Sequence, residues 1–258
     1  MVSERVHVEV FGQGPALVLI HGWGLNSAVW QQLAPELAQH FEVHAVDLPG
    51  FGLSHELNVS ADLQDWVNSI AQAIDKPAIW LGWSLGGLVA TQAALSHPKL
   101  VSKLITVASS PKFAQEQDWP GIKPEVLSLF QQQLQQDFVK TLERFLAIQA
   151  LGSESAKQDI MKLKQMLAQR PLPSTKALSI GLDLLDSIDL RPRLVDIDIP
   201  FLRIYGRLDS LVNQRLISKI DKLVPQSQRV VMNKASHAPF ISHKEEFLDH
   251  LLTFVDVK

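Results

Sequence analysis

A serine, an acid and a histidine stand in this sequence in an order that could turn a hydroxyl group into a nucleophile. Ser84 is the centre of a G-x-S-x-G pattern over residues 82–86. A serine hydroxyl is a weak nucleophile until a neighbouring base accepts its proton, and that base needs a carboxylate to orient it. The pattern therefore predicts nucleophilic catalysis at Ser84, with a purely structural turn as the alternative.

The acid and the base are expected after the serine in the chain, on loops that follow strands. Asp209 comes three residues after the apolar run 201–206, and His237 comes four residues after the run 228–233. Both loops belong at the carboxyl edge of a parallel sheet, where Ser84 also belongs. We therefore predict Ser84, Asp209 and His237 as a catalytic triad.

Other histidines and aspartates could compete for these roles, but their positions favour a structural interpretation. Asp47 stands at a strand end but precedes the serine, so we interpret it as a turn carboxylate. Six of the nine histidines lie in or beside predicted helices, strands or surface loops: His40, His44, His55, His97, His243 and His250. Five aspartates are interpreted as solvated charges: Asp183, Asp186, Asp189, Asp196 and Asp198.

The negative charge that develops during acyl transfer needs two N–H donors. The first is expected from Leu85, the residue after the nucleophile, and the second from the loop after the apolar run 16–20. Trp23 lies in that loop between two glycines, which permit an unusual backbone path. We predict Trp23 as the second donor and as a wall of the pocket; an ordinary packed aromatic residue is the alternative.

The elements that must position these residues alternate between strand and helix. The elbow needs a strand before Ser84, which the apolar run 78–81 predicts, and a helix after it, which residues 87–95 predict. Alternation of this kind indicates an α/β fold with a mostly parallel, doubly wound sheet of about seven strands. The other predicted strands are 5–11 (an edge strand), 16–20, 41–46, 103–109, 201–206 and 228–233. The other predicted helices are 27–39, 60–74 (with Ser60 as its N-cap), 212–223 and 244–256.

The alternation stops between residues 111 and 195, where the pattern is helical throughout. Four helices are predicted there, at 124–135, 137–150, 154–169 and 175–188. We expect this block to be a helical lid over the strand ends, inserted into a core formed by residues 1–110 and 196–258.

Composition restricts the function further. The chain has 258 residues, a net charge of −3 and no cysteine, which gives no reason to expect nucleic-acid binding or thiolate chemistry. We find no metal-binding cluster and no phosphate-binding loop, so we predict no cofactor and no metal. Residues 1–10 have the alternation of a strand, and no apolar run is long enough to span a membrane. We expect a cytoplasmic protein, and a monomer.

Taken together, the elements, the triad order and the inserted helices resemble the α/β-hydrolase superfamily over nearly the whole chain. Within it, the chain resembles the biotin-pathway carboxylesterases that hydrolyse the methyl ester of pimeloyl-[acyl-carrier protein]. The stretches that carry this resemblance include two that lie in the lid, where superfamily members differ most. They are residues 21–26, 46–52, 78–90, 107–111, 119–124, 143–147 and 238–243.

The resemblance implies that the enzyme releases methanol from a pimeloyl chain still bound to acyl carrier protein, and that small esters are side substrates. By position, Ser84, Asp209 and His237 match the triad, and Trp23 and Leu85 match the oxyanion contacts. The lid segment that lines the acyl channel is matched by Phe145, Leu146, Ala147, Ile148 and Gln149. The basic residues that contact the acidic carrier are matched by Lys140, Arg144 and Lys157.

One position departs from the family, because Met161 stands where a fourth basic residue is expected, and Lys162 or Lys164 could replace it. Residues 140–170 nevertheless hold six basic and three acidic side chains on a chain of net charge −3, which favours a docking patch over a merely solvated surface. Two alternatives stay open: a general short-chain carboxylesterase without a carrier partner, and a non-catalytic ligand receptor on the same fold.

Overall fold

The computed structural model describes residues 5–256, so Met1–Glu4, at the start of the predicted N-terminal strand pattern, lie outside the described residues. A single seven-stranded sheet runs through the molecule in the order β1-β3-β2-β4-β5-β6-β7. Only β1 is antiparallel to its neighbour, and every other pairing is parallel. The predicted sheet is therefore confirmed. Its strands are Val8–Phe11 (β1), Ala16–Ile20 (β2), Glu42–Val46 (β3), Ala78–Trp83 (β4), Val101–Val107 (β5), Phe201–Gly206 (β6) and Gln228–Met232 (β7).

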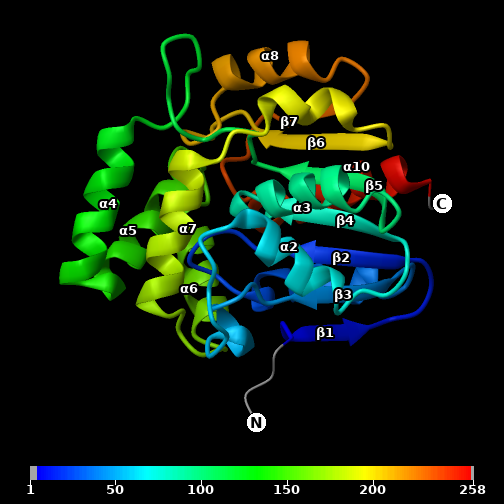
Figure 1. Ribbon diagram of the computed structural model, residues 1–258, viewed down its shortest axis with the longest axis horizontal. Coiled ribbons are helices and arrows are strands. Elements are labelled where there is room, and N and C mark those ends of the chain that lie inside the picture. Colours follow the sequence, from blue (N-terminus) through cyan, green and yellow to red (C-terminus); the bar gives the residue numbers. More distant parts are fainter. Residues whose placement is uncertain (1–4, 257–258) are drawn as a thin grey trace.

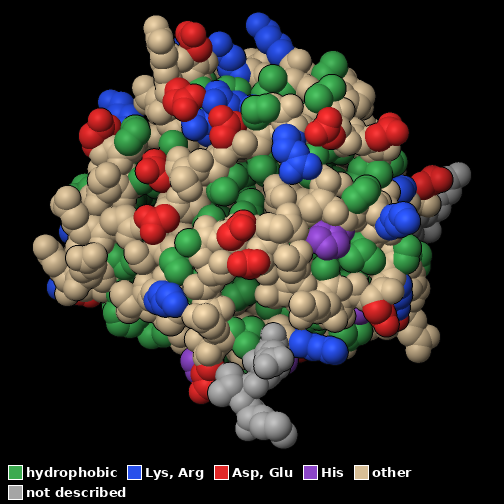
Figure 2. Space-filling view, viewed as in Figure 1, with side chains coloured by type: hydrophobic (Ala, Val, Ile, Leu, Met, Phe, Trp, Pro, Cys, Tyr) green, Lys and Arg blue, Asp and Glu red, His purple; other side chains and the backbone are tan. Residues whose placement is uncertain are grey.

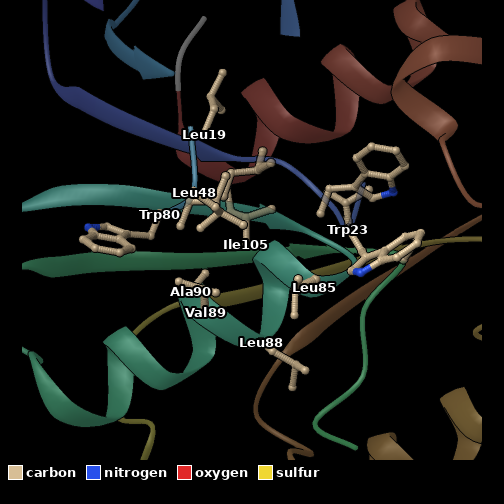
Figure 3. Packing of buried hydrophobic residues seen from close by; sticks show 14 of the residues in the cluster. Leu19, Trp23, Leu48, Trp80, Leu85, Leu88, Val89, Ala90 and Ile105 are labelled. Atoms are coloured by element: carbon tan, nitrogen blue, oxygen red, sulfur yellow. The ribbon is translucent and has the colours of Figure 1, made fainter. Parts of the chain in front are cut away.

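The central strands are apolar because both faces of the sheet are covered by helices. All residues of β2 and β4 are buried. Helix α3 (Leu85–Ser96) lies against β2, β4 and β5 and is buried nearly all round. In Figure 3, Val89 and Ala90 of α3 face the strands that carry Trp80 and Ile105. In Figure 1, α2 (Leu63–Ala71) and α3 lie in front of the sheet, and α10 (Lys244–Val255) lies behind it.

Several helices of the core are shorter than the sequence pattern predicted. The predicted helix 60–74 begins only after Asp62, whose carboxylate accepts the N–H of Gln64, while the hydroxyl of Ser60 bonds to Asp65 instead of capping the helix. The predicted helix 27–39 is wrong as one element, because Pro35 interrupts it. A short 3₁₀ turn, η1 (Ser27–Trp30), and α1 (Ala34–Leu37) replace it. The remaining short elements of the core are η2 (Gly52–Ser54), η3 (Arg191–Asp196), α8 (Gln214–Leu223) and α9 (Pro239–Ser242).

Four helices follow β5 and lie beyond the carboxyl ends of the parallel strands (Figure 1). The chain returns to the sheet only at β6, which pairs directly with β5. We call these four helices the cap. They are α4 (Pro124–Gln136), α5 (Phe138–Gln149), α6 (Ala156–Leu167) and α7 (Thr175–Ser187), which confirms the four predicted helices to within one or two residues at each end.

Between residues 5 and 256, none of the helices combines the length and the apolar character that crossing a bilayer requires.

Candidate active site

Ser84 sits at the sharp turn between β4 and α3, in a backbone conformation that side chains rarely adopt. Its φ is 55° and its ψ is −117°. Such a conformation costs about 1–3 kcal/mol and persists only where the surroundings hold it. Two hydrogen bonds do so: the Ser84 N–H donates to the carbonyl of Val107 at 2.9 Å, and the Ser109 hydroxyl donates to the carbonyl of Ser84 at 2.7 Å.

The glycines around Ser84 are required by close backbone contacts. A Cβ atom at Gly82 would lie 2.1 Å from the carbonyl oxygen of Gly86, and one at Gly86 would lie 2.4 Å from the carbonyl oxygen of Ile20. Real Cβ atoms do not approach backbone this closely, so the strand and the helix can meet only if both residues are glycine. The turn thus presents the Ser84 side chain outward from the strand ends, free of its own helix.

The structure brings the three predicted triad residues together in a buried chain of hydrogen bonds. His237 Nε2 lies 3.0 Å from Ser84 Oγ, and His237 Nδ1 lies 2.8 Å from Asp209 Oδ2. The other Asp209 oxygen accepts the N–H groups of Leu211 and Val212 at 2.8 and 3.1 Å. The carboxylate therefore faces Nδ1, which leaves Nε2 to accept the proton of Ser84.

The main chain near Trp23 and Leu85 lies beside Ser84, as the two predicted N–H donors require. Leu85 is the first residue of α3, so its N–H has no partner inside the helix. A Cβ atom at Gly22 would lie 3.2 Å from the Ser84 Cβ, which places the chain next to Trp23 at the serine. Figure 3 shows Trp23 and Leu85 near one another at the start of α3.

The indole of Trp23 forms its contacts with the cap. Its Nε1 donates to the carbonyl of Leu178 in α7 at 2.8 Å, and its ring packs edge-to-face on Phe145 of α5 with centroids 4.7 Å apart. Gly181 allows this approach, because a Cβ atom there would lie 2.7 Å from the indole. Since the indole N–H is taken, the backbone N–H is the donor that Trp23 can offer to a substrate.

A cavity of about 260 Å³ opens from Ser84 into the space between the cap and the sheet. Its walls are mostly apolar, with residues from α4, α5 and α7, from the segment that precedes α4 and from the loop after Asp209. An apolar cavity that ends at an activated serine suits an acyl chain with an ester at its tip. The lining residues are Ser84, Phe113, Gly121, Ile122, Lys123, Val126, Leu127, Phe130, Phe145, Ile148, Leu182, Leu185, Ser210 and Leu211.

The five lid residues expected along the acyl channel divide according to the face of α5. Phe145 and Ile148 line the cavity, as their spacing of three on one helix face allows. Leu146, Ala147 and Gln149 are not among the lining residues. Leu146 is buried elsewhere in the core, Ala147 is exposed, and Gln149 is buried near the loop of His237. Five consecutive helical residues point in different directions, so one stretch cannot line one wall.

The expected docking residues lie on the outside of the cap and differ in whether they form ion pairs. Lys140 is exposed and pairs with Asp137 at 3.1 Å. Arg144 and Lys157 are exposed and have no ion-pair partner among residues 5–256. Of the two candidates to replace the missing fourth basic residue, Lys164 pairs with Glu143 at 2.7 Å, while Lys162 bonds weakly to the carbonyl of Ile241 at 3.5 Å.

Sequence reasoning did not assign a role to His21, which lies two residues before Trp23 in the loop after β2. Its Nδ1 donates to the Gly22 carbonyl at 2.8 Å, and its Nε2 accepts the N–H of Leu48 at 3.1 Å. Burial lowers its pKa below the ordinary 6.5, although nearby Asp47 acts in the opposite direction. The side chain is therefore a neutral brace between two loops. The signal for it was the histidine at the end of the apolar run 16–20.

The carboxylate oxygens of Asp47 likewise form hydrogen bonds that hold the surrounding loops. Its two oxygens accept the N–H groups of Ser27 at 2.6 Å and Leu53 at 2.9 Å, which agrees with the interpretation as a turn carboxylate. Within the part of the chain that the structure describes, no three His, Asp or Glu side chains are grouped as metal ligands would be.

Comparisons with known proteins agree with this architecture. Residues 15–244 match the family described as the α/β-hydrolase fold. An esterase from Exiguobacterium antarcticum superposes with a TM-score of 0.86 over 97% of this chain and 95% of its own, at 23% identity. A bromoperoxidase from Bacillus anthracis superposes with a TM-score of 0.87 over the same shares at 21% identity. Identities this low concern the fold alone, and the predicted α/β-hydrolase fold is confirmed.

Sequence relatives are much more similar. A pimeloyl-[acyl-carrier protein] methyl ester esterase from Photobacterium profundum is 56% identical over 248 residues, which cover 95% of this chain and 96% of that protein. A protein of the same name from Vibrio vulnificus is 50% identical over 253 residues, or 98% of this chain and 99% of that protein.

Proposed function

We propose that this chain, which belongs to the α/β-hydrolase fold family, is a serine carboxylesterase that hydrolyses the methyl ester of pimeloyl-[acyl-carrier protein]. The observation that carries the esterase reaction is the buried chain Ser84–His237–Asp209 at the end of an apolar cavity. The substrate comes from relatives that match nearly the whole chain and bear that name. The products are methanol and a pimeloyl chain that now ends in a carboxylate and is still attached to the carrier at its other end.

The acylation step follows from the positions of the groups. His237 Nε2 accepts the proton of Ser84 as the oxygen attacks the ester carbonyl, and Asp209 stabilises the cation that forms. We assign to the N–H groups of Leu85 and Trp23 the role of stabilising the negative oxygen. As the tetrahedral intermediate collapses, the C–O bond to methoxide breaks and His237 returns the proton to it, so methanol leaves and an acyl-Ser84 ester remains.

Deacylation repeats the same proton transfers with water. His237 accepts a proton from the water that attacks the acyl-Ser84 carbonyl, and then protonates Ser84 as the ester bond breaks. One water is consumed, and the acid and the methanol are released. The methylene chain lies against apolar side chains such as Phe130, Phe145 and Leu182, where each buried CH₂ contributes about 0.8 kcal/mol.

We assign carrier docking to the outer surface of the cap, and Arg144 and Lys157 support this assignment best. Both are exposed cations without an ion pair among the described residues, whereas Lys140 already has Asp137 as a partner. The face drawn in Figure 2, which carries α2 and α3, shows both basic and acidic side chains. Met161, 54% exposed on the same helix as Lys157, would supply an apolar contact in place of the missing charge.

One comparison of substrates tests the proposal. Purified protein is assayed on pimeloyl-[acyl-carrier protein] methyl ester, on free methyl pimelate and on short nitrophenyl esters. We expect the highest kcat/KM on the carrier-bound ester, together with activity on the short esters. An apolar cavity discriminates chain length by only about 1–3 kcal/mol per methylene, so these side activities are a consequence of its lining. Equal kcat/KM on free and carrier-bound esters would favour a general carboxylesterase instead.

The receptor alternative is tested by the same assay. A chain that binds esters but releases no acid and shows no burst of product from a nitrophenyl ester is a receptor on the hydrolase fold. The distances of 3.0 Å from His237 to Ser84 and 2.8 Å from His237 to Asp209 support the enzyme over the receptor, because binding alone does not require this geometry.

A further inference from the structure

The loop that carries His237 is bound to the cap by two hydrogen bonds. The backbone N–H of His237 donates to the carbonyl of Gln149 at 3.1 Å. The Ser236 hydroxyl donates to the carbonyl of Leu151 at 2.9 Å. Gln149 is the last residue of α5 and Leu151 follows it in the turn to α6. The last carbonyls of a helix have no partner inside it, so they are available as acceptors for the catalytic loop.

The same turn also lies beside the loop that precedes Asp209. Gly152 closes the turn with a φ of +88°, and a Cβ atom there would lie 3.5 Å from the Leu208 Cβ. Leu208 in turn donates its N–H to the carbonyl of Ala235 at 3.0 Å. Residues 149–152, which we call the clamp turn, therefore hydrogen-bond to the loop of the base and lie beside the loop of the acid.

The backbone of His237 is held from two sides. Its carbonyl accepts the indole N–H of Trp83, at the end of β4, at 2.8 Å, while its own N–H is held by the clamp turn. Ser236, His237 and Gln149 are all almost fully buried. A buried polar group that loses its partner costs about 1–3 kcal/mol, so these contacts resist displacement of the loop. One anchor belongs to the sheet and the other belongs to the cap.

We propose that the clamp turn positions the catalytic histidine, so that the cap is part of the machinery that activates Ser84 and not only a cover over the acyl cavity. Ser236 is the positioning residue that fastens the two parts. The proposal rests on the proposed esterase function, since it requires His237 to act as the base. A displacement of about 1 Å at a reacting group can cost a hundredfold in rate, so a loosened loop acts on kcat.

Ser236→Ala tests this positioning role, because it removes one fastening and leaves the triad and the cavity lining intact. We expect kcat on nitrophenyl butyrate to fall about three- to tenfold, as the loss of one buried hydrogen bond implies, with KM unchanged. Covalent labelling of Ser84 by a fluorophosphonate, which also needs the base, should slow by the same factor. Ser236→Thr restores the donor and should recover most of kcat.

Thr141→Val is the matched control. It removes a buried hydroxyl from α5, the helix that ends at the clamp turn. Thr141 Oγ1 donates to the carbonyl of Asp137 at 2.8 Å, within the cap, and not to a catalytic loop. We expect a similar loss of Tm and an unchanged kcat. Gly152→Ala is a second variant for the clamp turn, since an alanine at positive φ strains it, and kcat should fall while KM stays constant.

Several results would overturn the proposal. One is a Ser236→Ala protein that loses Tm as the control does but keeps wild-type kcat and labelling rate. Another is a rise in KM at constant kcat, because the loop would then shape binding instead of positioning the base. A wild-type chain that neither hydrolyses the ester nor reacts with the phosphonate would remove the esterase function itself, and the positioning role with it.

Discussion

Ser84, His237 and Asp209 form one unit, because each hydrogen bond in the chain orients the next group. Ser84→Ala and His237→Ala should each lower kcat about a millionfold, and the double variant should lose little more. Asp209→Asn keeps the shape but loses the charge, and should cost about ten-thousandfold. Steady-state kinetics on a nitrophenyl ester, with Tm to verify folding, measures all four. Near-normal activity of Asp209→Asn would require another acid, although none of the rival aspartates is bonded to His237.

His21 makes folding sensitive to acid, for a reason visible at the residue scale. Burial lowers its pKa below 6.5, so the unfolded chain takes up a proton that the folded chain resists. The stability that His21 contributes is therefore fully present above pH 6.5 and is lost as the pH falls below that value toward the lower folded pKa.

Urea unfolding of the wild type and of His21→Gln, measured from pH 7.5 to pH 5.5, tests this effect. Glutamine retains an acceptor for the Leu48 N–H but does not titrate. The difference in unfolding free energy between the two proteins should shrink as the pH falls. A constant difference across this range would show that the histidine is not buried in its neutral form.

At the scale of elements, Trp23 connects the loop after β2 to the cap, through the hydrogen bond of its indole to Leu178 and its ring contact with Phe145. Trp23→Phe keeps the backbone N–H and an aromatic face but loses the bond to α7. We expect a lower Tm and a modest fall in kcat/KM, with KM rising at least as much as kcat falls. A thousandfold loss of kcat at constant KM would mean that the indole itself acts on the transition state, contrary to its engagement with Leu178.

Most of the elements could be predicted because long periodic segments carry their own signal. The four cap helices and all seven strands appear within three residues of the predicted ranges. The errors fall where a local polar contact or a proline overrides periodicity. Asp62 took the cap position expected of Ser60, and Pro35 divided the helix expected at 27–39. Neither outcome can be read from hydrophobic spacing. The first depends on which side chain reaches a free N–H, and the second on the N–H that proline lacks.

The residues of the site also differ in how well the sequence predicted them. Ser84, Asp209 and His237 could be chosen because strand-end positions converge in a parallel sheet. The acyl wall was assigned as a consecutive stretch, whereas the cavity uses only one face of α5 and adds side chains from α4 and α7. The contacts of the clamp turn join residues nearly ninety positions apart, and no local pattern announces a pairing between a carbonyl and a distant hydroxyl.

At the scale of the whole molecule, surface charge should affect turnover of the carrier-bound ester but not of small esters. Reversing Arg144 and Lys157 together to glutamate should raise KM for pimeloyl-[acyl-carrier protein] methyl ester, because acidic partners are steered by exposed cations. The kcat/KM on a nitrophenyl ester should hardly change, since neither residue lines the cavity. Added salt should weaken wild-type turnover of the carrier substrate only, with a Debye length of about 8 Å at physiological ionic strength.

Two controls define this experiment. Reversing Lys140, which already pairs with Asp137, should have a smaller effect than reversing Arg144. Equal slowing of both substrates by the double reversal would indicate a folding defect in the cap. If neither substrate slowed, the carrier would have to dock on another surface.

The pairing of β5 with β6 across the inserted cap sets an order of events on the ribosome. The edge of β5, complete at Val107, has no partner until Phe201 and the rest of β6 have been synthesised, which takes about 5–20 s at usual translation rates. An open strand edge of this kind invites pairing with other chains. Ribosome-stalled chains that end before residue 200 should therefore be protease-sensitive and should recruit chaperones, and protease resistance of such chains would contradict this. Ser84 is synthesised long before His237, so the proposed esterase reaction would begin only after the last segments of the chain have emerged.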